Sequence, residues 1–403
     1  MRILFLSRWY PFPADNGSKI RVFNLIKSLA RHHEIHLISF VTDAIQPEHI
    51  MAMHQYCASV ETFPFHEFQP NRSSALMRLL SPRPRYVDET FSKELYQATV
   101  AAGQREQFDL VLASQTGMAP YALAVPHVPK VLEEAELSVY RDQYLKERHP
   151  VRRLRKWLMW EKCRRYFAYL LKRYHGATVV SEPELIPIQE TLPGFAPVAL
   201  VANGADIERF TGNFGQPQPN TIVYTGALTY YVNFDAMQFF LREVFPLVQQ
   251  AIPEVTIKIA GRLEGVAVDQ LPSNPGVIYT GHQSDIRPLI AQSWVSVVPE
   301  RIGGGTRIKV PESMALGTPV VATTRGATGL LVRDGHDILV ADQPRQMADA
   351  IIRLLRDPQL REQISRNGRR TVEQHYDWRI IGDQLDDVLA TIVQQSQRAP
   401  RVA

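Results

Sequence analysis

The chain has 403 residues, of which 45% are hydrophobic and 21% charged, a composition that excludes a disordered, collagen-like or low-complexity protein. Its 45 basic and 41 acidic residues nearly balance, and its two cysteines are too few for a disulfide framework or a four-ligand zinc site. Because no 18 apolar residues run together and the apolar start is too short for a signal peptide, we expect a cytoplasmic protein.

Short apolar strands alternate with helical segments along the first two hundred residues. In chain order, the pattern predicts a strand at 3–6, a helix at 18–30, a strand at 34–40, and further short strands at 110–113, 130–132 and 177–180. Buried strands that alternate with helices are typical of a parallel sheet covered on both faces.

The composition changes after Asn203, where the Gly-, Pro- and Asn-rich segment 211–220 predicts a loop between domains. The alternation then resumes, with strands at 221–224, 255–259, 277–279, 294–298 and 319–322, helices at 233–251, 284–291 and 306–316, and mostly helical sequence from 343 to about 395. We therefore expect an α/β protein with an N-terminal Rossmann-like domain (1–202), a C-terminal one (203–378), and a final helix (379–403) that crosses back to the first domain and ends in a frayed tail.

The most informative stretch lies between the predicted strand at 294–298 and the helix that follows it. Gly303, Gly304 and Gly305 let the backbone approach a ligand closely. Thr306 is a candidate helix N-cap, although capping by Thr306 would compete with a ligand for the backbone amides. Free amides at a helix start bind anions, above all phosphate.

Charged side chains accompany these glycines. Arg301, Arg307 and Lys309 supply positive charge for a diphosphate, and Glu312 supplies a carboxylate for a sugar-like diol. Three glycines alone would indicate only an ordinary turn between a strand and a helix. The preceding strand, the spaced cations and the carboxylate together favour a nucleotide diphosphate site.

These motifs resemble those of retaining glycosyltransferases of the group 1 (family 4) type. The similar segments are Met1–Leu29, which holds Tyr10-Pro-Phe-Pro and Asn16-Gly-Ser, then Val201–Asp206, Tyr224–Thr229, Gly281–Arg287, Val297–Val321 and Arg325–Leu330. The resemblance implies a GT-B fold, in which two Rossmann-like, doubly wound domains face a central cleft. It also implies transfer of a sugar from a nucleotide-diphosphate sugar, of UDP or GDP type, to an acceptor in bacterial polysaccharide, glycolipid or glycoconjugate biosynthesis.

The resemblance assigns roles to individual residues. The catalytic candidates are Glu312, Lys309 and Arg301. The donor-binding candidates are Gly17, Ser18, Gly226, Arg262, Gly281, His282, Gly303, Gly304, Gly305, Thr306, Arg307 and Glu312. The acceptor-side candidates are Arg21, Glu133 and Glu136.

Three departures from the family pattern bear on these roles. Gly304 stands where the family has the first of its two motif glutamates. The family's N-terminal histidine is absent, and the corresponding region offers Glu133 and Glu136 instead. The usual arginine and lysine after the first strand of the second domain are also absent, so the diphosphate charge falls to Arg301, Arg307 and Lys309. For Arg262 two interpretations stay open, a further phosphate ligand or an ordinary surface arginine.

We expect transfer without a metal, because no Asp-x-Asp motif follows a strand. Helix N-termini and cations would then stabilise the departing nucleotide diphosphate. The backbone amides of Gly17 and Ser18 would donate hydrogen bonds to the same diphosphate from the opposing domain. Alternatively, Ser18 only caps the helix that begins there. In the retaining mechanism that the resemblance implies, the leaving phosphate accepts the proton, so no dedicated base is needed. We expect His33, His36, His127 and His282 to be structural rather than catalytic.

The segment 146–174 is strongly basic, with eleven Lys or Arg and two Glu between Lys146 and Arg173. Apolar residues recur in it at helical spacing. One interpretation is a core helix with a charged solvent face. The other is a helix on an anionic membrane surface, with Trp157 and Trp160 at the interface, which would suit a lipid-linked acceptor and a peripheral location on the inner face of the membrane. Glycan and small-molecule acceptors stay open, and nucleic acid is disfavoured because no binding motif accompanies the charge.

Other function classes remain as alternatives. The missing first glutamate is compatible with a catalytically silent scaffold on the membrane. A sugar-nucleotide epimerase of the same fold is a closer enzymatic alternative. A nicotinamide dehydrogenase is disfavoured, because neither 7–16 nor 303–309 supplies Gly-x-Gly-x-x-Gly after a strand.

Overall fold

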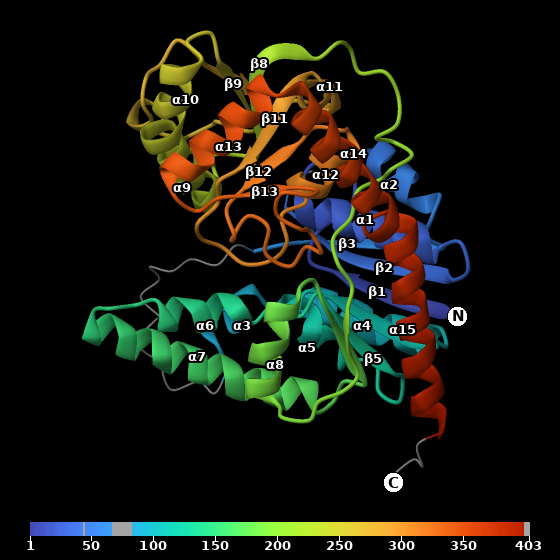
Figure 1. The fold of residues 1–403 in the computed structure, drawn as a ribbon. Coiled ribbons are helices and arrows are strands. Elements are labelled where there is room, and N and C mark those ends of the chain that lie inside the picture. The colour runs from blue at the N-terminus through green and yellow to red at the C-terminus, as the bar shows by residue number, and fades with distance from the viewer. Residues whose placement is uncertain (43–44, 67–82, 399–403) are drawn as a thin grey trace. The chain divides into compact units, whose positions relative to one another are not determined.

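A computed structural model describes residues 1–42, 45–66 and 83–398. The chain forms two compact units (Figure 1). Unit 1 comprises Met1–Val201 with Gly382–Ala403, and unit 2 comprises Ala202–Ile381. Each unit is a parallel sheet with helices on its faces.

Unit 1 contains a seven-stranded parallel sheet in the order β3-β2-β1-β4-β5-β6-β7. Its strands are β1 (Arg2–Ser7), β2 (Glu34–Val41), β3 (Ser59–Pro64), β4 (Leu110–Ser114), β5 (Lys130–Glu133), β6 (Gly176–Val179) and β7 (Val198–Leu200). Its helices are α1 (Gly17–Leu29), α2 (Pro47–His54), α3 (Arg85–Thr90), α4 (Lys93–Arg105), α5 (Ala119–Ala122), α6 (Ser138–Leu145), α7 (Pro150–Leu171) and α8 (Leu185–Thr191).

Unit 2 contains a six-stranded parallel sheet in the order β10-β9-β8-β11-β12-β13. Its strands are β8 (Gln218–Thr225), β9 (Thr256–Ala260), β10 (Val277–Gly281), β11 (Ser293–Val298), β12 (Val320–Ala322) and β13 (Leu339–Val340). Its helices are α9 (Tyr231–Phe239), α10 (Phe245–Ala251), α11 (Arg287–Ala291), α12 (Lys309–Ala315), α13 (Pro344–Arg356) and α14 (Pro358–His375).

Burial on both faces explains why the strands read as continuous apolar runs. Ile3, Leu4, Phe5 and Leu6 of β1 are fully buried, as expected for a central strand with helices on either side. In each sheet the strand order changes direction once, between β1 and β4 and between β8 and β11. Ligands in such sheets bind beyond the carboxyl ends of the strands at this point, so these two edges are where a site is expected. The predicted pair of Rossmann-like parallel sheets is confirmed.

The final helix, α15 (Trp378–Arg398), begins in unit 2 and continues in unit 1. Gly382 lies against α1 so closely that an added Cβ would stand 2.2 Å from the Ser28 Cβ. Ile392 likewise packs on Gly176 at the start of β6. The C-terminal helix is therefore an integral layer of the first unit. Among the described residues, every helix is too short or too polar to cross a bilayer.

Candidate functional site

The glycine-rich loop after β11 adopts backbone conformations that favour glycine. Gly303 and Gly305 have φ of 95° and 69°, in the left-handed region where side chains are strained. An added Cβ at Gly303 would stand 2.8 Å from Arg307 Nη2. Arg307 folds back over the loop and donates hydrogen bonds to the carbonyls of Ile302, at 3.0 Å, and of Gly304. The guanidinium therefore holds the loop in shape, and its buried Nε has no partner among the described residues.

Thr306 is not the N-cap of the following helix. α12 begins at Lys309, later than the predicted 306, and no side chain caps it. Thr306 Oγ1 instead accepts a hydrogen bond from Asn203 Nδ2 at 2.8 Å. The glycine-rich loop is thus tied to the Asn203-Gly204 segment that precedes the first strand of unit 2. This competition for the hydroxyl explains why the capping expectation was wrong.

Lys309, whose side chain is 12% exposed, belongs to a charged cluster at the start of α12. Its Nζ lies 2.6 Å from Glu300 Oε1 and 4.0 Å from the centre of the Tyr224 ring. Tyr224 also donates to Asn233 Oδ1 at 3.0 Å. Burial lowers the pKa of Lys309, and the adjacent Glu300 carboxylate opposes that shift. The ammonium and carboxylate compensate each other, and the second oxygen of Glu300, Oε2, is buried without a partner among the described residues.

Glu312, on the first turn of α12, is 7% exposed. No hydrogen bond or ion pair joins its carboxyl to another residue in the described ranges. Burial raises the pKa of Glu312 to about 7, while the charges of Lys309 and Arg209 oppose the rise. Because buried carboxyls are normally hydrogen-bonded, an unpartnered one beside a glycine-rich loop is suited to accept hydrogen bonds from a ligand diol.

Arg301 is directed away from this cluster. It lies 3.1 Å from Asp235 Oδ1, over the Phe239 ring, and its side chain is 43% exposed. The predicted phosphate ligands thus occupy different environments. Lys309 is compensated in the interior, Arg307 braces the loop, and Arg301 is paired at the surface.

The remaining donor candidates of unit 2 lie on the loops after β8, β9 and β10. Gly226 has φ of 153°, and an added Cβ there would stand 3.0 Å from Lys309 Nζ. The loop after β8 therefore packs on the Lys309 cluster. Gly281 has φ of 69° at the end of β10, and the neighbouring His282 is exposed, as is Arg262 after β9.

In unit 1, the acceptor-side candidates Arg21 and Glu133 are fully buried against each other. Arg21 Nη2 lies 2.6 Å from Glu133 Oε1, with side-chain exposures of 1% and 0%. Arg21 also donates to the Val201 carbonyl, and Ser114 Oγ donates to Glu133 Oε2. The pair connects α1, β4 and β5, so the structure gives both residues a structural position rather than one facing a substrate.

Gly17 and Ser18 lie in the first turn of α1, which begins one residue before the predicted helix start at 18. Asn16, rather than Ser18, caps this helix, because its side chain accepts from the Lys19 amide at 3.1 Å. Ser18 Oγ instead accepts a hydrogen bond from Gln115 Nε2 at 3.3 Å. The hydroxyl therefore faces the carboxyl end of β4.

A cavity of about 480 Å³ opens at this same edge of the unit 1 sheet. Aromatic side chains form much of its wall, together with charged and amide groups. The lining includes Arg8, Phe40, Phe65, Tyr86, Phe91, Gln115, Tyr121, Glu134 and Glu136. Of the sequence candidates, Glu136 lies here and Glu133 does not.

Two lining residues, Gln115 and Glu134, have left-handed backbones, with φ of 71° and 54°. Gln115 Nε2 donates to Glu134 Oε2 at 3.0 Å. Such conformations are costly for residues with side chains and cluster at functional sites. Burial raises the pKa of the partly buried Glu134 to about 7; Arg21 opposes the rise and Glu133 adds to it.

Sequence reasoning missed Glu134, although a signal was present. Glu133 is the last residue of β5 and turns toward Arg21. Successive side chains of a strand point to opposite sides, so the next residue, Glu134, is the one turned the other way at the ligand-binding edge.

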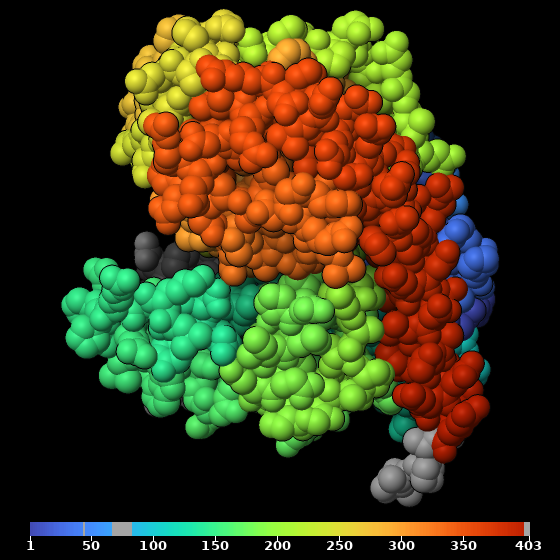
Figure 2. Space-filling model, viewed as in Figure 1, coloured from blue at the N-terminus to red at the C-terminus, as the bar shows by residue number. Residues whose placement is uncertain are grey.

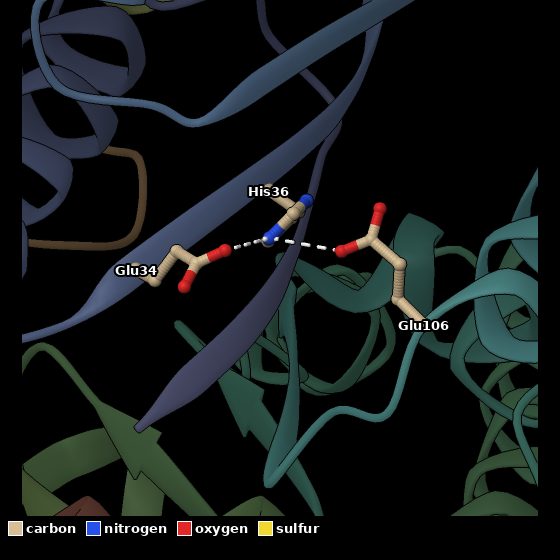
Figure 3. A group of neighbouring side chains, drawn as sticks. All are labelled: Glu34, His36 and Glu106. Carbon is tan, nitrogen blue, oxygen red and sulfur yellow. Dashed lines mark hydrogen bonds and ion pairs between the residues drawn. The ribbon is translucent and has the colours of Figure 1, made fainter.

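A histidine between two carboxylates is the only possible metal-binding group found among the described residues. His36 Nε2 lies 3.0 Å from Glu34 Oε1 and 3.2 Å from Glu106 Oε2 (Figure 3). Glu34 is already paired with Arg2, and the group lies at the start of β2, the edge of the sheet opposite the cavity. We interpret it as a hydrogen-bonded brace for that edge.

Comparison with known proteins adds independent evidence. Residues 219–357 match the family described as "Glycosyl transferases group 1". The chain is 30% identical over 161 residues to a phosphatidyl-myo-inositol mannosyltransferase of Mycobacterium leprae, covering 38% of this chain and 42% of the relative. It is 29% identical over 136 residues to the capsular polysaccharide biosynthesis glycosyltransferase CapM of Staphylococcus aureus, covering 32% and 34%. The matches thus span less than half of either relative.

The whole fold resembles a solved structure. The crystal structure of HepE from Anabaena in complex with UDP and glucose superposes with a TM-score of 0.67 at 16% identity, covering 97% of this chain and all of the other. This likeness shows the fold, which is GT-B. The resemblance predicted from the motifs is therefore confirmed, in that residues 219–357 match the group 1 glycosyltransferase family and the fold is GT-B.

Proposed function

We propose that this protein is a glycosyltransferase that moves a sugar from a nucleotide-diphosphate sugar to an acceptor. The observation that carries the proposal is Glu312, a buried carboxyl beside the glycine-rich loop that has no partner within residues 1–42, 45–66 and 83–398. A diol on the donor would supply the hydrogen bonds that this carboxyl lacks. The family match over the same segment and the UDP bound to a protein of the same fold support this assignment.

The glycine-rich loop and its cations would stabilise the negative charge of the departing diphosphate. Gly303, Gly304 and Gly305 allow phosphate oxygens to approach backbone amides, which stabilise developing negative charge without reorganisation. Arg307 places a guanidinium over this loop, and Lys309 begins the helix that follows it. A diphosphate would compete with Glu300 for the ammonium. We propose that these groups act without a metal, and that the sugar is transferred with retention, the leaving phosphate accepting the acceptor's proton.

For the acceptor we propose the cavity of unit 1. Aromatic walls pack against the apolar faces of sugar rings, and the carboxyls of Glu134 and Glu136 can accept hydrogen bonds from hydroxyls. The matched relatives act on a phosphatidylinositol and in capsular polysaccharide synthesis. A glycan or a lipid-linked glycan made on the cytoplasmic side is therefore the acceptor class we propose.

The experiment measures release of nucleotide diphosphate from UDP- and GDP-sugars by wild type and two glutamate variants. Glu312→Gln removes the proposed diol ligand, whereas Glu362→Gln changes an exposed glutamate on α14 and serves as the control. We expect release by wild type and the control, and at least a hundredfold slower release by Glu312→Gln. Equal rates in all three proteins would overturn the proposal. Conversion of the sugar without nucleotide release would instead identify an epimerase.

A further inference from the structure

The first half of α7 is exposed around nearly its whole circumference. Nine of the ten residues 150–159 are exposed, whereas Trp160, Cys163 and Phe167 in the second half are buried in the core of unit 1. Together with α6 this half forms a hairpin that stands out from the rest of the unit (Figure 1), and the same hairpin is prominent in the space-filling view (Figure 2). Residues 150–159 are therefore a surface element rather than part of the core.

An apolar stripe runs along this exposed half-helix. Val151, Leu154 and Leu158 are 71%, 57% and 54% exposed. Their spacing of three and four places them on one face, at about 100° per residue. By the same spacing, that face lies roughly opposite the buried side of the helix, which carries Cys163 and Phe167. We call these three residues the docking stripe.

More exposed apolar side chains flank the docking stripe. Trp157 and Met159 are 41% and 42% exposed, and Leu145 at the end of α6 is 49% exposed. Trp160, which the sequence placed beside Trp157 at an interface, is 6% exposed and belongs to the core. Isolated exposed apolar residues are ordinary, but several on one protruding element indicate an interaction surface.

The charge of this part of α7 indicates which kind of partner it binds. Residues 150–165 hold seven Lys or Arg and one Glu. The single carboxylate, Glu161, is already paired with Arg164 and Arg165. The cations Arg152, Arg153 and Arg155 alternate with the stripe residues and are exposed. Such a surface repels a second copy of itself and attracts an anionic one.

We propose that the docking stripe and its flanking cations bind the surface of an anionic lipid bilayer. The apolar side chains would enter the boundary between headgroups and acyl chains while the guanidinium groups contact anionic headgroups, as interfacial amphipathic helices do. Long Arg and Lys side chains reach the headgroup level from such a position. This inference concerns residues outside both proposed substrate sites and does not depend on the proposed reaction.

Vesicle flotation tests the proposal with full-length protein. The lipids are phosphatidylcholine alone and phosphatidylcholine mixed with phosphatidylglycerol. The test variant, Leu154→Gln with Leu158→Gln, keeps helix propensity but removes the stripe. The control, Met51→Gln, changes an equally exposed apolar residue, 61% exposed, on α2 of the same unit.

We expect wild type and the control to float with the anionic vesicles, and added salt to weaken this binding. The double variant should bind at least about tenfold more weakly, since two apolar side chains no longer enter the bilayer. Absence of wild-type binding, or equal binding by the double variant, would overturn the proposal. So would a wild-type dimer that the double variant converts to monomer without any change in flotation, since the stripe would then bind a second copy. An unchanged circular dichroism spectrum and an unchanged thermal unfolding transition in each variant report that the protein is folded, and they keep this test separate from that of the donor site.

Discussion

Lys309 Nζ lies 2.6 Å from Glu300 Oε1 inside unit 2, so the Lys309 ammonium is already compensated by a buried carboxylate. Tyr224 and Asn233 complete the cluster. The Tyr224 hydroxyl lies within hydrogen-bond distance of Glu300 and Asn233, and Asn233 Oδ1 accepts from Lys309. The Glu300 side chain is fully buried, and that of Lys309 is 12% exposed. The ammonium proposed to meet a diphosphate is therefore already paired with Glu300.

The pairing of Lys309 with Glu300 predicts that removing one of the two charges costs more stability than removing both. Lys309→Met leaves Glu300 as an uncompensated buried charge and should destabilise unit 2 by about 3–5 kcal/mol. The double change Lys309→Met with Glu300→Gln removes both charges and should recover most of that loss. Urea unfolding of the four proteins in this cycle measures the coupling. Additive losses would show that the two residues do not compensate each other.

Glu312 predicts a pH-dependent stability. Because burial raises the pKa of Glu312 from 4.5 to about 7 in the folded protein, folding favours its protonated form. Its destabilising effect is absent below pH 4.5 and develops as the pH rises to about 7. Glu312→Gln should therefore gain in stability relative to wild type over this range, by about 3 kcal/mol at pH 8. Thermal unfolding from pH 4 to 8 measures the gap, and a gap that stays constant with pH would contradict the raised pKa.

The neighbours Glu133 and Glu134 should respond in opposite ways. Glu133→Gln leaves the buried Arg21 without its counter-ion, so we expect a loss of roughly 3 kcal/mol in stability. Glu134→Gln should gain stability as the pH rises above 4.5, because burial raises the pKa of this carboxyl to about 7, while it raises the acceptor KM or slows transfer. Its raised pKa further predicts that a wild-type activity change near pH 7 disappears in Glu134→Gln. A stability loss confined to Glu134→Gln would reverse these assignments.

Alanine substitutions at two glycines of one loop distinguish the effect of backbone strain from that of steric crowding. Gly303→Ala adds both a strained φ and a Cβ 2.8 Å from Arg307, whereas Gly305→Ala adds only the strained φ, since nothing lies within 4 Å of its Cβ position. Strain of this kind costs about 1–3 kcal/mol. We expect both variants to be destabilised and Gly303→Ala to bind nucleotide diphosphate more weakly than Gly305→Ala. Calorimetric titration measures the difference, and equal affinities would show that Arg307 does not shape the phosphate-binding surface.

Much of the fold is predictable because the central strands are buried on both faces. Their apolar runs and the glycine-rich turns placed β1, β2, β4 and most of the unit 2 strands within a few residues. Of the four edge strands, β10 was predicted, whereas β3, β7 and β13 were missed. β3 is only partly buried, and β13 has two residues, so neither carries a continuous apolar signal. α12 was predicted to begin too early, since Thr306 lies in the preceding loop and its hydroxyl accepts a hydrogen bond from Asn203 rather than from a helix amide.

The candidate site was predictable in its backbone but not in its side-chain pairing. Glycines and cations near the end of β11 were recognisable from their order along the chain. Sequence spacing does not show that Lys309 meets Glu300, that Arg301 turns to Asp235, or that Arg21 holds Glu133. The last pairing depends on contacts over more than a hundred residues of chain, and it determines that Glu134 rather than Glu133 reaches the cavity.

The central claim is that unit 2 binds a nucleotide diphosphate with Glu312 as a ligand. Thermal shift with UDP, GDP, ADP and dTDP, with and without magnesium, on wild type and Glu312→Ala tests it most directly. A ligand at 100 times its dissociation constant should stabilise the protein by about 2.7 kcal/mol. The account predicts stabilisation of wild type by one of these nucleotides, independent of magnesium, and a clearly smaller shift in Glu312→Ala. No shift with any nucleotide, or equal shifts in the two proteins, would contradict it.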